Sequence, residues 1–180
     1  WYFSFTLFSS VSFEIGLKTN FDNRANIAVT GFYVKYKDAQ RALNATVIDA
    51  LGFETQETLF FNAAQMVVYG IEAEGSVMLT DDLILTGNAA WTKGDYKEYI
   101  ADTNFDGIID VDQSDYPVER APEFMMSENL NYTYDMADKG EMSFNTRLSH
   151  ESESIVFHAV TGIPNTTLNA KTLLDATITY

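Results

Sequence analysis

The chain has 180 residues, of which 26 are Asp or Glu and 11 are Lys or Arg, and its formal net charge at pH 7 is −15. This acidity excludes nucleic acid as an expected partner, because the sequence has no basic stripe to neutralise phosphates. Cysteine is absent, which excludes disulfides and thiolate chemistry, and no apolar run approaches the roughly 18 residues that a transmembrane helix needs.

The N-terminal part of the chain alternates apolar and polar residues, as expected of strands whose two faces differ. A first strand is predicted over residues 11–21, followed by a tight turn at Asp22 and Asn23, which both tolerate a left-handed backbone. A second strand is predicted over residues 24–40, although its phase is unclear around residues 31–33. A polar loop is then expected over residues 41–58.

The alternation continues to the end of the chain. Two strands are predicted over residues 61–79 and from residue 83 toward residue 100, and three more over residues 124–134, 141–150 and 171–180. Short turns are expected at residues 80–82 and 135–140, and long loops at residues 101–122 and 151–170.

Short and long connections therefore alternate along seven predicted strands. Short turns at one rim and long loops at the other are typical of outer-membrane barrels, and strands of about 10 residues match a tilted span of the bilayer. The predicted fold is all-β, an antiparallel meander that forms part of a transmembrane β-barrel with lipid on its apolar face and a polar lumen.

A soluble fold is the competing interpretation, because a β-sandwich or a lipocalin-like barrel also alternates, with its apolar face turned inward. Its function would be that of a secreted β-domain that binds carbohydrate together with calcium. The first residue is not Met and the chain stops inside a predicted strand, so we expect a fragment. Residues 1–10 are left unassigned, and residues 11–180 are predicted to be the partial barrel.

Five segments resemble, in the family's order, barrel motifs of TonB-dependent outer-membrane receptors. None is specific alone, but five in order at matching strand positions form a stronger pattern. They are residues 12–18 (E-x-G-x-K), Arg24 with Phe32, Tyr36 and Gln40 (R…F…Y…Q), residues 69–74 (G-[VI]-E-x-E), residues 120–124 ([RN]-x-P) and residues 173–180, which resemble the strand before the final ones.

This resemblance implies a barrel of about 22 strands, plugged by an N-terminal domain that this chain does not contain. It implies uptake of a scarce ligand (siderophore-bound iron, cobalamin or an oligosaccharide) across the bacterial cell outer membrane, and no enzymatic activity. The implied partners are outer-membrane lipid, the transported ligand, and the TonB complex, which acts through the missing N-terminal part.

The sharpest local motif is an acidic loop, residues 102–112, which matches the start of a calcium-binding loop. Gln113 stands where such loops carry a bidentate acid, so we expect weak affinity, and the alternative is a solvated loop that binds no metal. The predicted fold requires no cofactor. The acidic loop is a separate feature, and its pattern indicates calcium as the ion that it would bind. The candidate ligands are Asp102, Asn104, Asp106, the carbonyl of Ile108, Asp110 and Asp112.

Catalytic candidates are few. Glu72 and Glu74 are two residues apart on one strand face, and paired carboxylates can exchange protons. We expect them instead to be wall residues that pair with cations of a neighbouring strand or of the plug. His150 and His158 are the only histidines, and no arrangement of Ser, His and Asp is evident.

Overall fold

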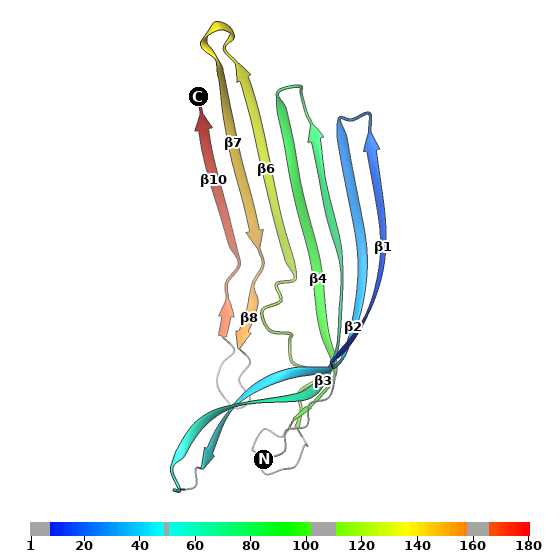
Figure 1. The fold of residues 1–180 in the computed structure, drawn as a ribbon, viewed down its shortest axis with the longest axis vertical. Helices are drawn as coiled ribbons and strands as arrows, with labels where there is room; N and C mark the ends of the chain where they lie inside the picture. Colours follow the sequence, from blue (N-terminus) through cyan, green and yellow to red (C-terminus); the bar gives the residue numbers. More distant parts are fainter. Residues whose placement is uncertain (1–7, 49–50, 102–110, 158–165) are drawn as a thin grey trace.

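The computed structural model describes residues 8–48, 51–101, 111–157 and 166–180, and its main sheet consists of long antiparallel strands side by side (Figure 1). Its order is β1-β2-β3-β4-β6-β7-β10, so each strand pairs with the next long strand along the chain. The predicted seven-strand meander is thereby confirmed. The strands are β1 (Ser9–Phe21), β2 (Ala25–Ile48), β3 (Glu54–Met78), β4 (Leu83–Ala101), β6 (Phe124–Asp135), β7 (Glu141–Glu151) and β10 (Lys171–Thr179).

The tight turn between β1 and β2 is the one predicted. Asp22 and Asn23 have φ angles of 47° and 58°, the left-handed conformation that Asp and Asn adopt at low cost. The Arg24 N–H closes the turn by donating to the Phe21 carbonyl at 2.8 Å. The Arg24 guanidinium also pairs with Asp81 of the neighbouring turn at 2.9 Å, which ties two turns at the same end of the sheet.

The other short turns also lie where they were predicted. β3 ends at Met78 and β4 begins at Leu83, which leaves a four-residue connection. β6 and β7 are joined through the 3₁₀ turn η1 (Ala137–Lys139), and Gly140 follows it with a φ of 96°, which favours glycine.

The long connections contain more strand than the sequence predicted. Residues 41–58 are not simply a loop, because β2 and β3 stay paired up to the couple Ile48 and Glu54 and extend beyond the rest of the sheet as a hairpin (Figure 1). Irregularities in their register lie around Ala39, next to Asp38 with a φ of 55°. Among the described residues, no further strand pairs with this hairpin over most of its length. Its pairing therefore requires no strict alternation of apolar and polar residues, and the sequence of this segment resembled that of a loop.

The other two long connections carry short strands. β5 (Val111–Asp112) pairs with the end of β4, and β8 (Ser154–Phe157) pairs with β9 (Thr166–Leu168) in a separate two-stranded sheet.

The main sheet is a single layer whose described residues form almost no core. The buried apolar side chains are Ala39, Ala64, Val67 and Tyr96, whereas Ile15 is 81% exposed. The accessible surface is 13005 Å², while a compact protein of this mass would expose about 8,800 Å². A large exposed apolar face indicates that it lies against lipid or another partner.

The register also resolves the phase that the sequence left unclear. Gly31 pairs with Ile15 and Ile71, and Tyr33 pairs with Phe13 and Tyr69, so both belong to the apolar face. Phe32 lies on the opposite face, where its ring covers Gly70 of β3. A bulky residue beside a glycine in this way compensates for the missing side chain.

Candidate functional site

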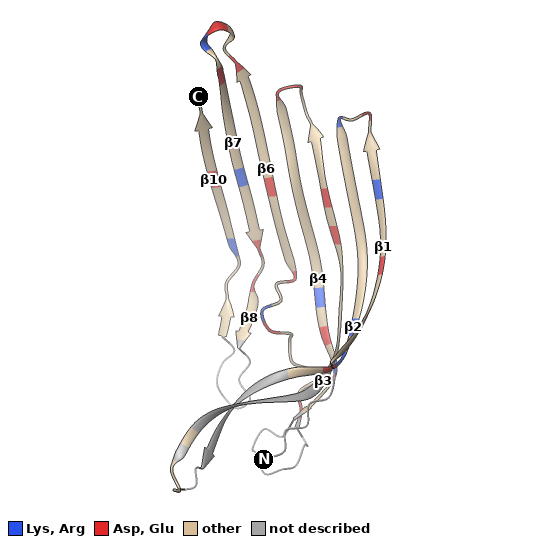
Figure 2. Ribbon diagram, in the orientation of Figure 1, with Lys and Arg blue, Asp and Glu red and all other residues tan. Residues whose placement is uncertain are grey.

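Polar side chains from five strands gather on one side of the sheet, which we call the polar face. Figure 2 shows that charged residues are few along the strands and more frequent at the turns. The Asn26 amide donates to the Ser76 hydroxyl at 2.7 Å across β2 and β3. A shallow hollow of about 440 Å³ on this face is lined by Asn26, Glu74, Gly75, Ser76, Thr86, Gly87, Asn88, Ser127, Asn129 and Arg147.

Glu72 and Glu74 lie on the polar face of β3, as predicted. Glu72 lies between Thr30 and Ala90 on the neighbouring strands, and Glu74 lies opposite Asn88. Both side chains are exposed, and neither forms an ion pair with any described residue. Their charges are therefore available to a cation outside the described part of the chain.

Arg147 is the cation of β7 on this face. The register places it between Asn129 of β6 and Asp175 of β10. Its Nε donates a long hydrogen bond of 3.4 Å to the Ser127 hydroxyl. The polar face thus carries fixed charges of both signs on an otherwise uncharged, hydrogen-bonding surface.

A small apolar cluster marks the end of the polar face near the long connections. The rings of Tyr96 and Tyr99 are 5.0 Å apart, and Ser114 fastens the following segment to β4 by accepting a hydrogen bond from the Tyr99 N–H at 2.9 Å. The sequence did not predict this cluster, because the residues come from segments interpreted as strand end and polar loop. Its members are the buried Ala39, Ala64 and Tyr96 and the partly buried Met66, Tyr99 and Val118.

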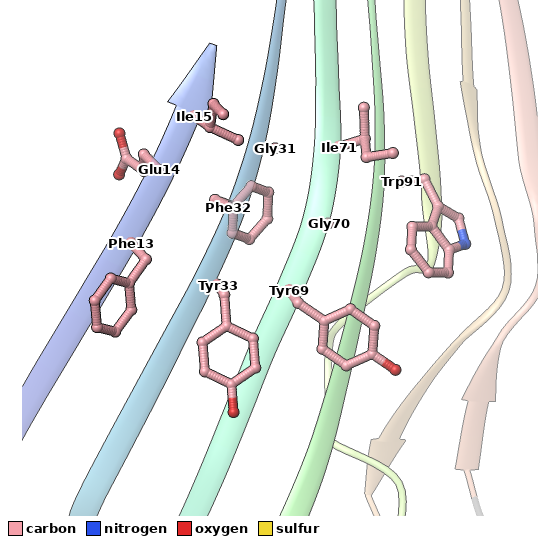
Figure 3. A pocket seen from close by; sticks show the side chains of 10 residues that line it. All are labelled: Phe13, Glu14, Ile15, Gly31, Phe32, Tyr33, Tyr69, Gly70, Ile71 and Trp91. Carbon is pink, nitrogen blue, oxygen red and sulfur yellow. The ribbon is translucent and has the colours of Figure 1, made fainter.

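Aromatic rings cross the opposite face, which we call the apolar face, at the same end. Tyr69 stacks on Tyr33 with ring centroids 6.5 Å apart and meets the edge of Trp91 at 6.1 Å. Figure 3 shows both tyrosine hydroxyls directed away from Gly31, and the Tyr69 hydroxyl donates to Asp95 at 3.3 Å. Such a row of amphipathic rings is typical of the boundary between hydrocarbon and headgroups.

A carboxylate lies in the middle of the apolar face. The register places Glu128 of β6 between Gly87 and Leu148, near the middle of its strand. A Cβ added at Gly87 would lie 3.3 Å from Glu128 Cγ, so the glycine leaves room for the glutamate stem. Glu128 was not noticed in the sequence, because the residues on both sides of it alternate regularly between apolar and polar.

Most of the predicted calcium ligands (Asp102, Asn104, Asp106, Ile108 and Asp110) lie outside the described residues. Asp112 is described, and its carboxylate accepts a hydrogen bond from the Ser114 N–H at 2.9 Å. Hydrogen bonds from the Ser114 side chain and backbone hold the pKa of Asp112 below its ordinary value of 3.8. Among the described residues, no three acidic or histidine side chains are arranged to hold a metal ion.

The two histidines do not form a site together in the described structure. His150 lies on the apolar face, where its Nδ1 is 2.8 Å from the Thr172 hydroxyl and its ring centroid is 6.1 Å from that of Phe124. His158 lies outside the described residues.

A one-layer meander with one apolar and one polar face, aromatic rings near one edge and short turns at one end only defines the wall of an outer-membrane β-barrel. The family described as "TonB dependent receptor-like, beta-barrel" matches residues 8–180. The chain therefore belongs to the TonB-dependent receptors, a family of receptors and transporters in the bacterial outer membrane. Its apolar face meets lipid, and its polar face lines the lumen.

Solved structures agree in fold. The ferric yersiniabactin uptake receptor FyuA from Yersinia pestis is similar at a TM-score of 0.65 and 12% identity, over 95% of this chain and 22% of that chain. The siderophore receptor PirA from Acinetobacter baumannii is similar at a TM-score of 0.60 and 15% identity, over 95% of this chain and 25% of that chain. The FrpB iron transporter from Neisseria meningitidis is similar at a TM-score of 0.62 and 14% identity, over 97% of this chain and 24% of that chain.

The chain thus spans about a quarter of the length of these structures. Such low identities show the fold alone. A comparison with curated protein sequences finds no match. No helix among the described residues has the length and apolarity needed to cross a membrane. The soluble alternative receives no support from these comparisons.

Proposed function

We propose that this chain is part of the barrel wall of a receptor that takes up a scarce ligand across the outer membrane, with energy supplied by the TonB complex. The observation that carries the proposal is the family match over residues 8–180. The ligand classes are siderophore-bound iron, cobalamin or an oligosaccharide. Siderophore-bound iron is the first to test, because the similar structures include a ferric yersiniabactin uptake receptor, a siderophore receptor and an iron transporter.

The polar face supports a role as the lining of the passage. Glu72 and Glu74 are exposed there without an ion pair in the described part of the chain. Carboxylates in a lumen are stabilised by a cationic partner, which a plug domain of the complete receptor would supply. Nearer the long connections, the partly exposed ring of Tyr99, which packs against the buried Tyr96, offers an apolar contact for a ligand that enters from outside.

Uptake in cells tests the proposal. A strain that lacks the full-length receptor should lose uptake of one radiolabelled ligand among a ferric siderophore, cobalamin and an oligosaccharide, and loss of TonB should reproduce the defect. Unchanged uptake of all three classes in both strains would contradict the proposal. The double substitution Glu72→Gln and Glu74→Gln should lower uptake without loss of the folded barrel. The matched control is Asp138→Asn with Glu141→Gln, which removes two exposed carboxylates at the turn between β6 and β7.

We also propose, on sequence grounds, that the acidic loop binds calcium weakly. Its ligands lie mostly outside the described residues, so the proposal depends on the spacing of the oxygen donors around Gly107. Without the bidentate acid at Gln113, a dissociation constant of about 10⁻⁴–10⁻³ M is expected, the range of extracellular modules.

A further inference from the structure

The apolar face has a hollow of about 580 Å³ where its aromatic rings begin (Figure 3). Gly31 provides no side chain to fill it, and Ile15 and Ile71 flank this glycine on the neighbouring strands. Tyr33 and Trp91 border the hollow toward the long connections. Its lining is almost wholly apolar, so it suits a hydrocarbon chain and offers little to a polar ligand.

Two lysines lie beside these rings: Lys93 is level with Tyr33 and Tyr69, and Lys35 is level with Val67, two residues farther along β3. Lys35 follows Tyr33 by two residues on β2, and Lys93 follows Trp91 by two residues on β4, so both share the face of the rings. The two lysines flank β3, and strand spacing and rise put their Cα atoms about 12 Å apart. Within the described part of the chain, neither ammonium group is in an ion pair.

Asp95 is the acid on β4 at the same edge. The register places it opposite Val67, which separates it from Lys35, and its carboxylate accepts the hydrogen bond from Tyr69. The carboxylate is therefore partly satisfied by a neutral donor, and the two lysines remain available to an anion from outside the chain.

We propose that this edge of the wall binds the phosphate of an outer-leaflet lipid, with Lys35 and Lys93 at the phosphate and one acyl chain in the hollow over Gly31. In outer-membrane barrels the end with the long loops faces the cell exterior, so the rings and lysines lie at the outer leaflet. Lysines near an anionic lipid surface attract its headgroups while their stems cover apolar surface. The site is on the lipid side of the wall and does not depend on the transported ligand.

The test is lipid binding to the full-length receptor in detergent, measured by native mass spectrometry in the presence of EDTA. The probes are lipid A with both phosphates, dephosphorylated lipid A and inorganic phosphate. The double substitution Lys35→Gln and Lys93→Gln should weaken binding of phosphorylated lipid A by about 25-fold, because each lysine near such a surface contributes about fivefold. Lys18→Gln with Lys139→Gln removes the same charge elsewhere and should leave binding unchanged.

Two further variants probe the hollow and the acid. Gly31→Leu fills the hollow and should weaken binding of phosphorylated lipid A while the lysines remain. Asp95→Asn removes the nearby negative charge and should strengthen it. Heat-dependent gel mobility identifies folded barrels, and the lysine variants decide the question if Gly31→Leu does not fold.

Wild-type binding by the double lysine variant, equal loss in the two double variants, or equal binding of dephosphorylated lipid A would overturn the proposal. Competition by inorganic phosphate at the concentration of the lipid would show an anion site without a lipid, which would overturn it as well.

Discussion

Ile71 offers the sharpest test of which face meets lipid. It lies on the apolar face of β3, between Gly31 and Trp91, and its side chain is 53% exposed. Ile71 lies two residues inward from Tyr69, whose ring marks the boundary with the headgroups, and this is about 7 Å along the strand. An arginine there would lie in the hydrocarbon region, between the headgroup boundary and the bilayer midplane.

The substitution Ile71→Arg should lower the free energy of unfolding by about 1–3 kcal/mol, because the cost of an arginine on the lipid face falls from about 2–4 kcal/mol at the midplane to about 0–1 kcal/mol near the interfaces. Its cross-strand neighbours offer no carboxylate, and a contact with the Trp91 ring would return about 0.5–1 kcal/mol. We therefore expect a net loss of about 1–2 kcal/mol.

The matched control is Asn145→Arg. Asn145 lies on the polar face between Asn131 and Thr177, where an arginine remains in a wet lumen. Its effect should stay within about 0.5 kcal/mol. The measurement is urea unfolding of the full-length receptor in lipid vesicles, followed by gel mobility. Equal losses for the two variants, or no loss for Ile71→Arg, would refute the assignment of the faces.

Three other outcomes are expected. Gly70→Ala should cost about 1–3 kcal/mol of stability, because the added methyl group would overlap a backbone oxygen of β4 and the ring that covers Gly70. Gly31→Ala should be tolerated, since the nearest atom is 3.8 Å from the added carbon. Similar losses of stability for both variants would contradict the packing argument. A cysteine introduced at the exposed Glu153 should react with a membrane-impermeant reagent on intact cells, whereas one at Asp138 in a short turn should react only after the outer membrane is opened; the reverse result would invert the proposed sidedness. Millimolar calcium should protect the acidic loop of the full-length receptor from protease, and Asp106→Ala should abolish that protection; a loop equally cleaved with and without calcium would show that it is only a solvated segment.

Much of the wall was predictable because a strand with one lipid face and one lumen face must alternate. That constraint explains why the seven strands and the three short turns were predicted close to their observed positions, and why Glu72 was placed correctly on the polar face. The family motifs added the membrane context, which alternation alone does not distinguish from a soluble sheet. The acidic loop stays a prediction from sequence.

Other features depend on pairing between strands distant in sequence. The phase at Gly31 became clear only when its partners Ile15 and Ile71 were known, because a glycine carries no polarity signal. The extended hairpin was missed because backbone pairing can continue where no face must be buried. Glu128 beside Gly87 and the two lysines flanking β3 are juxtapositions across strands, and single-strand periodicity contains no information about a neighbour's register. Sequence alone thus determined the two faces of the wall, whereas the tertiary structure decided which side chains meet on each face.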